Sequence, residues 1–436
     1  MTIAAHTLGC KLNFAETSDT LRRLAAEGHT IVDFRESADL YIINTCTVTA
    51  VAEKKCRAAI RQAHRQNPDA QIVVMGCFAQ VAAGEIEHIP GVKFVLCNDR
   101  KHLLPEIISR PAGEINKPKS DAFALQWSSG DRTRTFFKIQ DGCDYFCTYC
   151  AIPYARGRSR SATIEETLCA ARRIADSGAK EVILTGVNTG TFGQGERLKV
   201  KGEMSNSPFL ELLRGLDQIE GILRYRISSI EPNLLTDEII DFVAHSRAFL
   251  PHFHIPLQAG SDHVLQLMHR RYDTDLYAAK MHKIKAVMPD ACIAADVMAG
   301  FNGETEEEFQ KVLSFIDSLP ISYLHVFTYS DRPGTAALKL GEKIPIPVRH
   351  EHTTRLLELS EKKHKAFIDS QLGKTRSVLW ESTPHSSNQA IKQSNNQTMQ
   401  GWTDNYIRVA RPYSPALVNT VELVPITPGN IVGDTD

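Results

Sequence analysis

The stretch from Asp141 to Arg160 reads DGCDYFCTYCAIPYARGRSR, and the interpretation of the whole chain begins there. Its three cysteines, Cys143, Cys147 and Cys150, are separated by three and then two residues. Thiolates this close on one loop can share a centre only if the loop wraps around it, as iron–sulfur loops do. A structural zinc site normally takes a fourth ligand and presents its cysteines as separated pairs, and three reduced cysteines in a turn are the simplest alternative. Three thiolates on a four-iron cluster would leave one iron open to a small molecule.

The composition indicates a globular chain of two or three domains. Of its 436 residues, 42% are hydrophobic and 23% are charged, which is enough for ordinary cores. Lys and Arg number 50 against 51 Asp and Glu, so a nucleic-acid site would have to be a local patch. The ten cysteines are too sparse for a disulfide scaffold and suggest metal binding in a reducing cytoplasm. We see no signal peptide and no apolar run of membrane length, so a soluble cytoplasmic protein is expected.

Residues 1–115 are predicted to form an N-terminal domain built on a parallel sheet. Strands are expected at residues 3–8, 40–44, 71–76 and 93–97, and an amphipathic helix is expected over residues 51–66. Alternation of strands and helices is typical of a flavodoxin-like or Rossmann-like sheet covered by helices.

Three further cysteines occupy equivalent places in this domain. Cys10, Cys46 and Cys77 each fall just past the carboxyl end of a predicted strand. Open parallel sheets bind ligands along that edge, because neighbouring loops converge there. The pattern therefore predicts a second site with three thiolates, for which Cys97 is a rival ligand because it also ends a strand.

The spacing C-x3-C-x2-C resembles the signature of the radical S-adenosylmethionine enzymes. In that family the open iron binds S-adenosylmethionine, and an electron from the cluster splits it into methionine and a 5′-deoxyadenosyl radical. The strings LGCKLN, NTCTVT and MGCFAQ are also similar to the methylthiotransferase branch of these enzymes. This resemblance implies an auxiliary four-iron cluster on Cys10, Cys46 and Cys77, and it gives Cys97 no counterpart.

The resemblance also implies a reaction. One S-adenosylmethionine methylates a sulfide held at the auxiliary cluster, and a second forms the radical that abstracts hydrogen from an adenine carbon, to which the methylthio group is then transferred. We therefore expect two [4Fe-4S] clusters and two S-adenosylmethionine molecules per turnover. No side chain is assigned as a protein acid or base, because the cofactors carry the chemistry.

Residues 128–370 are predicted to form the radical S-adenosylmethionine core, a partial (β/α)6 barrel. Strands are expected at residues 132–139, 181–185, 225–229, 252–257, 292–298 and 323–329. Barrel chemistry lies at the carboxyl ends of strands, and the polar residues there are candidate cofactor contacts: Gly186, Asn188, Ser229, Glu231, Gln258, Gly260 and Asp296. Turn formation and helix capping are the alternative roles for several of them.

Basic residues gather near the predicted mouth of the barrel. Arg156 and Arg158 follow the cysteine loop, and Arg332 stands in YSDRPGT. Each is a candidate partner for a substrate carboxylate, and the alternatives are an RNA phosphate contact or an ordinary salt bridge.

Residues 371–436 are predicted to form a small all-β domain. SVLWE, NYIRVAR and TVELVPI are strand-like and are separated by turn residues, as in a compact barrel. GWTDNYIRV resembles the RNA-binding TRAM domain. Trp402, Tyr406 and Arg408 could stack on bases or contact the RNA backbone, or they could belong to the core and the strand faces.

The motif strings also favour one substrate over its alternatives. LGCKLN and KIQDGCDYFCTYCAIPYARGRSRS look most like the branch that acts on N6-threonylcarbamoyladenosine in tRNA. YGCQMN is typical of the isopentenyladenosine branch, and LGCPKN of the branch that modifies a ribosomal-protein aspartate. A non-catalytic iron–sulfur RNA-binding protein is the alternative from another class. The expected partners are a tRNA anticodon stem-loop, an external electron donor and a sulfur source, and the chain is expected to be a monomer without membrane contact.

Overall fold

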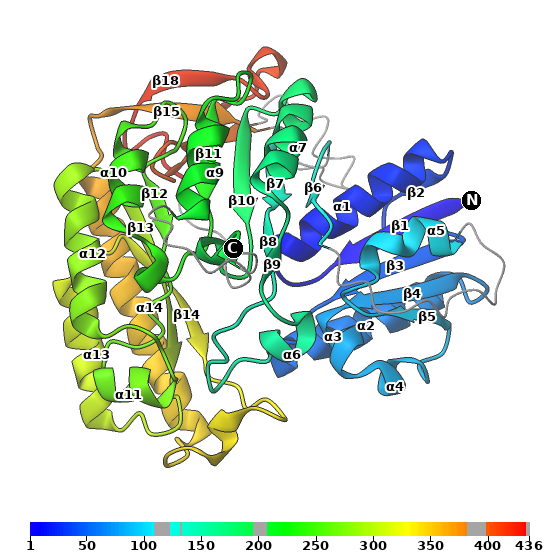
Figure 1. Ribbon diagram of the computed structural model, residues 1–436, viewed down its shortest axis with the longest axis horizontal. Coiled ribbons are helices and arrows are strands. Elements are labelled where there is room, and N and C mark those ends of the chain that lie inside the picture. Colours follow the sequence, from blue (N-terminus) through cyan, green and yellow to red (C-terminus); the bar gives the residue numbers. More distant parts are fainter. Residues whose placement is uncertain (109–122, 131–132, 195–206, 382–397, 433–436) are drawn as a thin grey trace, which may run out of the picture.

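The structure is a computed structural model that describes residues 1–108, 123–130, 133–194, 207–381 and 398–432. Figure 1 shows a parallel-sheet part at the N-terminal end (blue and cyan), a larger α/β part (green to yellow) and an antiparallel sheet near the C-terminal end (orange and red). The predicted α/β class is confirmed. Within the described ranges, no helix has the length and apolar character needed to cross a bilayer.

The N-terminal sheet has five parallel strands in the order β2-β1-β3-β4-β5. The strands are β1 (Thr2–Thr7), β2 (Thr30–Val32), β3 (Leu40–Thr45), β4 (Gln71–Gly76) and β5 (Val92–Leu96). This order is the flavodoxin-like one, in which the switch point lies between β1 and β3. The sequence did not predict β2, because it has only three residues and two of them are exposed.

Helices cover this sheet on both faces. They are α1 (Lys11–Ala26), α2 (Ala50–Gln66), α3 (Cys77–Val81), α4 (Ala83–Ile86), η1 (Lys101–Leu103) and α5 (Leu104–Ile108). The α2 helix begins where Thr49 accepts a hydrogen bond from the Ala52 N–H, which satisfies one of the free amides of the first turn. The predicted domain end at residue 115 lies outside the described residues.

The six strands predicted for the central part are all present and parallel, but hydrogen bonding divides them between two sheets. The first sheet has the order β11-β10-β7-β6 and contains β6 (Gln126–Trp127), β7 (Arg134–Lys138), β10 (Glu181–Thr185) and β11 (Arg224–Ile227), of which β6 runs antiparallel to β7. The second sheet contains β12 (His252–His254), β13 (Cys292–Ala299) and β14 (Tyr323–Thr328). The β12 strand is shorter than predicted, although the Ile255 and Leu257 N–H groups still donate to the Ala294 and Asp296 carbonyls of β13. An isolated bridge between Tyr225 and Phe249 lies where the two sheets meet.

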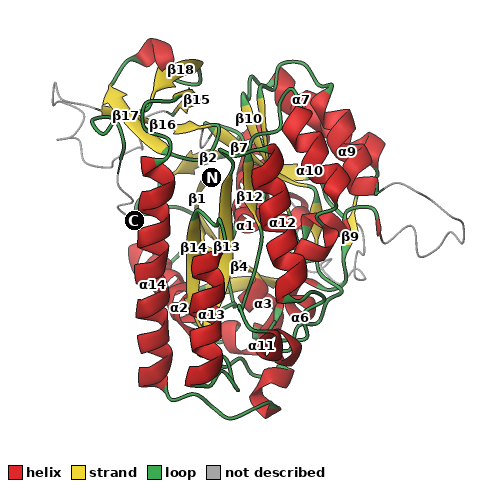
Figure 2. Ribbon diagram, turned by 90° about the vertical axis from the view of Figure 1, so that its left-hand side faces the viewer, coloured by secondary structure: helices red, strands yellow, loops and turns green. Residues whose placement is uncertain are grey.

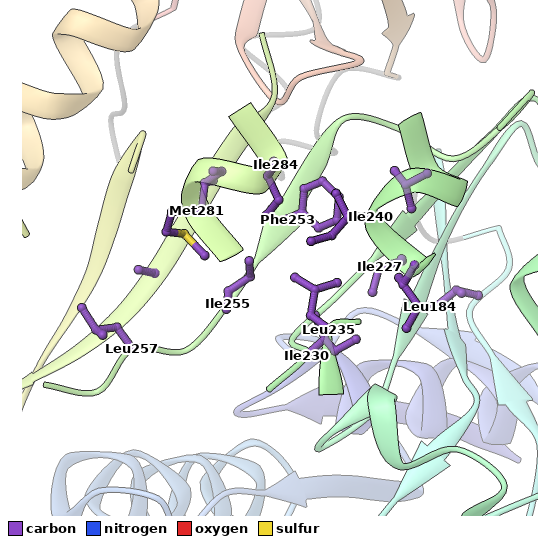
Figure 3. Packing of buried hydrophobic residues seen from close by; sticks show 14 of the residues in the cluster. Leu184, Ile227, Ile230, Leu235, Ile240, Phe253, Ile255, Leu257, Met281 and Ile284 are labelled. Carbon is purple, nitrogen blue, oxygen red and sulfur yellow. The ribbon is translucent and has the colours of Figure 1, made fainter. Parts of the chain in front are cut away.

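Helices pack outside these strands, and Figure 2 shows α12, α13 and the long α14 along one side of the molecule. The helices are α6 (Ile152–Arg156), α7 (Ile164–Asp176), η2 (Thr189–Thr191), α9 (Pro208–Asp217), η3 (Pro232–Leu234), α10 (Asp237–His245), α11 (Asp262–Leu267), α12 (Thr274–Val287), α13 (Glu306–Ser318), η4 (Ala336–Lys339) and α14 (Ile346–Asp369). Figure 3 shows the core between strands and helices, where Phe253 and Ile255 pack near Met281 and Ile284 of α12. Burial of this apolar surface fixes the strand ends that carry polar residues.

The C-terminal part is an antiparallel sheet in the order β17-β16-β15-β18. Its strands are β15 (Thr375–Trp380), β16 (Thr398–Thr403), β17 (Arg408–Pro412) and β18 (Val421–Pro425), and η6 (Pro415–Leu417) precedes β18. Val378, Trp380, Met399 and Val409 form its small apolar core. The predicted all-β character is confirmed, while closure into a TRAM barrel stays a prediction.

Buried arginines fasten this sheet to the central part. Arg224 donates twice to the carbonyl of Trp402 at 3.1 Å, and Arg226 donates to the carbonyls of Thr403 and Asp404 at 2.7 and 2.8 Å. Both guanidiniums share the Glu181 carboxylate, at 3.0 and 2.7 Å. The tail is therefore attached to the central part by charged, buried contacts.

Candidate active site

The cysteine loop is closed at its base by a short antiparallel pair, β8 (Gln140–Asp141) and β9 (Arg160–Ser161). Gly142 has φ +72°, and a Cβ there would lie 2.0 Å from the Arg158 carbonyl oxygen, so the crossing strands leave room only for glycine. The Cys143 N–H donates to the Gly157 carbonyl at 3.1 Å, which completes the base. The sequence thus folds locally into a tight loop that holds the three cysteines.

Each sulfur of this loop accepts a hydrogen bond. The Tyr145 N–H donates to Cys143 Sγ and the Ile152 N–H to Cys150 Sγ, both at 3.4 Å, while Arg270 Nη1 donates to Cys147 Sγ at 3.1 Å. Donors aimed at sulfur favour the thiolate form that binds metal. Against this, burial raises the pKa of Cys143 to about 11 and that of Cys150 to about 12. Stable thiolates here would need a metal centre, which an iron–sulfur cluster provides.

The second triad lies at the switch point of the N-terminal sheet. Cys10 caps α1, Cys46 follows β3, and Cys77 is the first residue of α3. Gly9 has φ +100°, and a Cβ at that position would lie 3.0 Å from Cys46 Sγ. Burial, with a smaller contribution from the charges of Cys77 and Cys10, raises the pKa of Cys46 to about 11. The three loops therefore bring these thiols together, as the strand pattern predicts.

The two triads border one chamber of about 610 Å³. Its wall includes Cys10, Cys46 and Cys77 from the N-terminal part and Cys150 from the cysteine loop, whereas Cys97 is not among the lining residues. Among the described residues, neither triad brings its three sulfurs within 4.8 Å of one another.

A buried ion network connects the two parts beside the chamber. Glu16 of α1 accepts from Lys101 at 2.7 Å, Lys138 of β7 at 2.9 Å and Arg156 of α6 at 3.2 Å. Arg156 also binds Asp141 at 2.8 Å. Burial would raise the pKa of Glu16, but Lys101, Lys138 and Arg156 hold that pKa well below its usual value, so the carboxylate stays charged. Glu16 was not predicted, because its partners are distant in the sequence.

A second cavity, of about 550 Å³, adjoins the chamber. Its polar wall includes Lys11, Ser228, Ser229, His252, His254, Asp296, Tyr323, His325 and Tyr406. Nε2 of His254 lies 2.7 Å from Oδ1 of Asp296, and His325 completes a group whose ligand atoms lie within 4.8 Å of one another. Lys11 and the histidines were not predicted as site residues. From the sequence, only the position of Lys11 next to Cys10 could have indicated that it belongs to the site.

Comparison with known proteins shows the family to which the chain belongs. The model of the Radical SAM superfamily matches residues 137–316, and the model described as Uncharacterized protein family UPF0004 matches residues 2–97. Threonylcarbamoyladenosine tRNA methylthiotransferase MtaB of Bacillus subtilis (strain 168) is 39% identical over 419 residues, covering 94% of this chain and 90% of that protein. The chain belongs to the MtaB-like radical S-adenosylmethionine methylthiotransferases.

Other methylthiotransferases of the family are also similar. The MtaB protein of Aquifex aeolicus (strain VF5) is 37% identical over 86% of this chain and 91% of its own length. The tRNA-2-methylthio-N(6)-dimethylallyladenosine synthase of Syntrophus aciditrophicus (strain SB) is 33% identical over 87% of this chain and 83% of its own length. Among solved structures, the radical S-adenosylmethionine methyltransferase TsrM of Kitasatospora setae has a TM-score of 0.52 and 14% identity, covering 75% of this chain and 74% of that one. That likeness shows the fold alone.

Most of the predicted cofactor contacts of this methylthiotransferase lie around the two cavities. Gly186 and Asp296 line both, Gln258 lines the chamber and Ser229 lines the second cavity. Buried Asn188 follows Gly186 after β10, with its N–H 2.9 Å from Gln140 Oε1.

Two other predicted cofactor contacts already have protein neighbours. Glu231 binds Arg270, the arginine that also contacts Cys147. Gly260 instead faces α13, where a Cβ would lie 3.1 Å from the Val312 backbone.

The predicted substrate arginines of the methylthiotransferase all have carboxylate partners. Arg156 belongs to the buried network with Asp141 and Glu16, Arg158 binds Asp144 at 3.3 Å on the surface, and Arg332 binds Glu53. An anionic substituent would have to compete with these acids for Arg156, Arg158 or Arg332.

The predicted tail residues form one stack. The rings of Trp402 and Tyr406 lie 4.5 Å apart, and Tyr406 stacks on His252 at 4.3 Å. Arg134 and Arg408 lie over the Trp402 ring, at 4.8 and 5.8 Å. Tyr406 thus closes one wall of the second cavity, and the tail is part of the site as well as a candidate RNA surface.

Proposed function

We propose that this chain adds a methylthio group to C2 of N6-threonylcarbamoyladenosine next to the anticodon of tRNA, forming 2-methylthio-N6-threonylcarbamoyladenosine. The observation that carries the proposal is one chamber lined by Cys10, Cys46 and Cys77 and also by Cys150 of the cysteine loop, in a chain 39% identical to an MtaB protein over 94% of its length. A methylthio transfer needs a sulfur site and a radical site that reach the same base, and a shared chamber meets that need.

The proposed cofactors are two [4Fe-4S] clusters and two S-adenosylmethionine molecules per turnover. Cys143, Cys147 and Cys150 would hold the radical cluster, and the triad of the N-terminal sheet would hold the auxiliary one. The bound groups would supply the radical and the sulfur chemistry. The chain's own residues would orient them: Gln258 and Asp296 present polar groups to the chamber, Gly186 lines it, and the buried Tyr145 and Cys147 limit the access of water to the loop.

The proposed domains follow the same division. The N-terminal part (1–115) carries the auxiliary site, the core (128–370) carries the radical site, and a TRAM-like tail (371–436) binds the tRNA. An external electron donor and a sulfur source are proposed as further partners, and the chain is proposed to act as a monomer in the cytoplasm.

Nucleoside mass spectrometry tests the proposal directly. tRNA from cells with the gene should contain 2-methylthio-N6-threonylcarbamoyladenosine, and tRNA from cells without it should contain only the precursor. Purified reconstituted protein should thiomethylate an anticodon stem-loop bearing threonylcarbamoyladenosine and leave one bearing isopentenyladenosine unchanged. Modification of the isopentenyl stem-loop would reassign the substrate, and failure to cleave S-adenosylmethionine would favour a non-catalytic RNA-binding protein.

A further inference from the structure

The second cavity contains a lysine that forms no ion pair with the described residues, and burial lowers the pKa of that lysine although the Asp296 carboxylate in the same wall acts to raise it. Lys11 lines this cavity, and it forms no hydrogen bond or ion pair with any residue that the structure describes. Asp296 is the one carboxylate in the lining, and it is bonded to His254. Nearby, Arg224 and Arg226 share the single carboxylate of Glu181, so their charge is not fully neutralised by ion pairing. The cavity therefore favours an anion at Lys11.

The remaining polar lining suits a ligand rich in amide and hydroxyl groups. His252 is only 7% exposed, and neither of its ring nitrogens has a hydrogen-bond partner among the described residues. Buried polar atoms of this kind are costly unless a ligand or water satisfies them. Ser228 and Ser229 offer hydroxyl groups from the loop after β11. An apolar group would leave all of these atoms unsatisfied.

The second cavity is placed to receive a substituent of a base that lies in the chamber. Six residues line both spaces: Gly9, Cys10, Leu12, Gly186, Asp296 and Phe327. A base held between the two triads could project a side group past Cys10 into the second cavity. Lys11 follows Cys10 and lines the second cavity but not the chamber, so a side group that passes Cys10 would meet the wall to which Lys11 belongs.

We infer that Lys11 binds the carboxylate of the N6 substituent and that the second cavity is the substituent pocket, with His252 bonding its hydroxyl or urea atoms. This inference rests on the proposed function. Lysine offers three donors and a full charge, and hydrogen bonds between charged groups are stronger than neutral ones. Because the three predicted arginines already have carboxylate partners, Lys11 becomes the specificity-determining cation.

The test compares two anticodon stem-loops that differ in one group. One bears threonylcarbamoyladenosine, and the other bears its primary amide, which has the same shape without the charge. Reconstituted wild-type protein should prefer the carboxylate by about tenfold or more in kcat/KM. Lys11→Met should reduce that preference to about one, Lys11→Arg should keep most of it, and Lys283→Met, a surface control on α12, should keep all of it.

The ratio between substrates is the decisive quantity, because a general loss of folding or clusters lowers both rates together. The same ratio of Kd values, measured by fluorescence anisotropy, keeps the test decisive if Lys11→Met has no turnover. A wild-type preference that Lys11→Met leaves unchanged would overturn the inference while the proposed function stands. A wild-type protein that modifies neither of these stem-loops, or that modifies instead a third one bearing isopentenyladenosine, would overturn the proposed function and the inference with it.

Discussion

Arg270 links the cysteine loop to the central α/β part of the molecule. Its guanidinium donates to Cys147 Sγ at 3.1 Å and to the Tyr149 hydroxyl at 3.3 Å, and it binds the Glu231 carboxylate. Positive charge and hydrogen bonds at ligand sulfurs stabilise the reduced state of an iron–sulfur cluster. Arg270 is therefore positioned to tune the radical site.

Replacing Arg270 by Gln should make the radical cluster harder to reduce. The expected shift is on the order of 50 mV to a more negative potential, because a charged donor to sulfur is lost. A redox titration followed by electron paramagnetic resonance would measure it in chains whose N-terminal triad is replaced by Ala, so that only one cluster contributes. Arg271→Gln is the matched control, since that guanidinium donates to the Asp144 carbonyl and not to sulfur. Equal potentials for Arg270→Gln and this control would exclude the tuning role.

Residue spacing marked the cysteines as candidate ligands, but it could not predict their surroundings. Three thiols in C-x3-C-x2-C are close in any fold, so Cys143, Cys147 and Cys150 were accessible to sequence reasoning. Arg270 reaches Cys147 across 123 residues of sequence, and only the folded barrel brings them together. Lys11 follows the predicted ligand Cys10 in the sequence. That it forms no ion pair with the described residues could not be predicted, because its surroundings come from distant parts of the chain.

The two cysteine triads lead to a prediction about cluster content and activity. Changing Cys143, Cys147 and Cys150 together to Ala should leave one cluster and abolish cleavage of S-adenosylmethionine. Changing Cys10, Cys46 and Cys77 together should also leave one cluster, but cleavage without thiomethylation should persist. Iron and sulfide analysis after anaerobic reconstitution measures both. Cys97→Ala should keep both clusters, and loss of one in that variant would contradict the ligand assignment.

At the scale of elements, the position of α1 is fixed at its start and along its buried face. Its first residue follows Cys10, and Glu16 on its buried face binds cations from η1, β7 and α6. The side chains of Glu16, Lys101 and Arg156 are at most 2% exposed, so none of these charges is solvated by bulk water. Removing one partner of such a network leaves uncompensated buried charge.

Glu16→Gln should therefore destabilise the chain by about 3–5 kcal/mol, as measured by denaturant unfolding. Glu106→Gln is the control, because its surface pair with Arg23 should contribute at most about 1 kcal/mol. The folded pKa of Glu16 lies below its usual value of 4.5, so its contribution is full above that value and is lost as pH falls through the depressed pKa. A difference between wild type and Glu16→Gln that disappears at neutral pH would contradict this account.

Hydrophobic periodicity predicted most of the elements, and the exceptions have physical causes. The buried strands β3, β4 and β10 are short apolar runs that a sequence displays plainly. The exposed β2 lacks that signal, and its place beside β1 is set by pairing. The division of the central strands between two sheets depends on which strands pair in three dimensions, and no local sequence pattern indicates that pairing.

At the scale of the whole molecule, buried hydrogen bonds and ion pairs bind the C-terminal sheet to the central part. The carbonyls of Trp402, Thr403 and Asp404 satisfy the buried Arg224 and Arg226, and Glu381 binds Arg134 at 2.8 Å. Deleting residues from Gly373 onward should thus lower the Tm by roughly 5 °C or more, in addition to weakening tRNA binding. Arg408→Gln is the comparison, since it should weaken tRNA binding with little change in Tm. A truncated chain that melts at the wild-type temperature would show that the tail contributes nothing to the stability of the core.

The pinning of α1 also has a consequence for movement during turnover. This helix begins beside Cys10, and Glu16 binds it to β7 and α6, so among the described residues it acts as a spacer between the two cysteine sites. We therefore expect the distance between the two cysteine sites to stay nearly constant while the nucleotide turns from one site to the other.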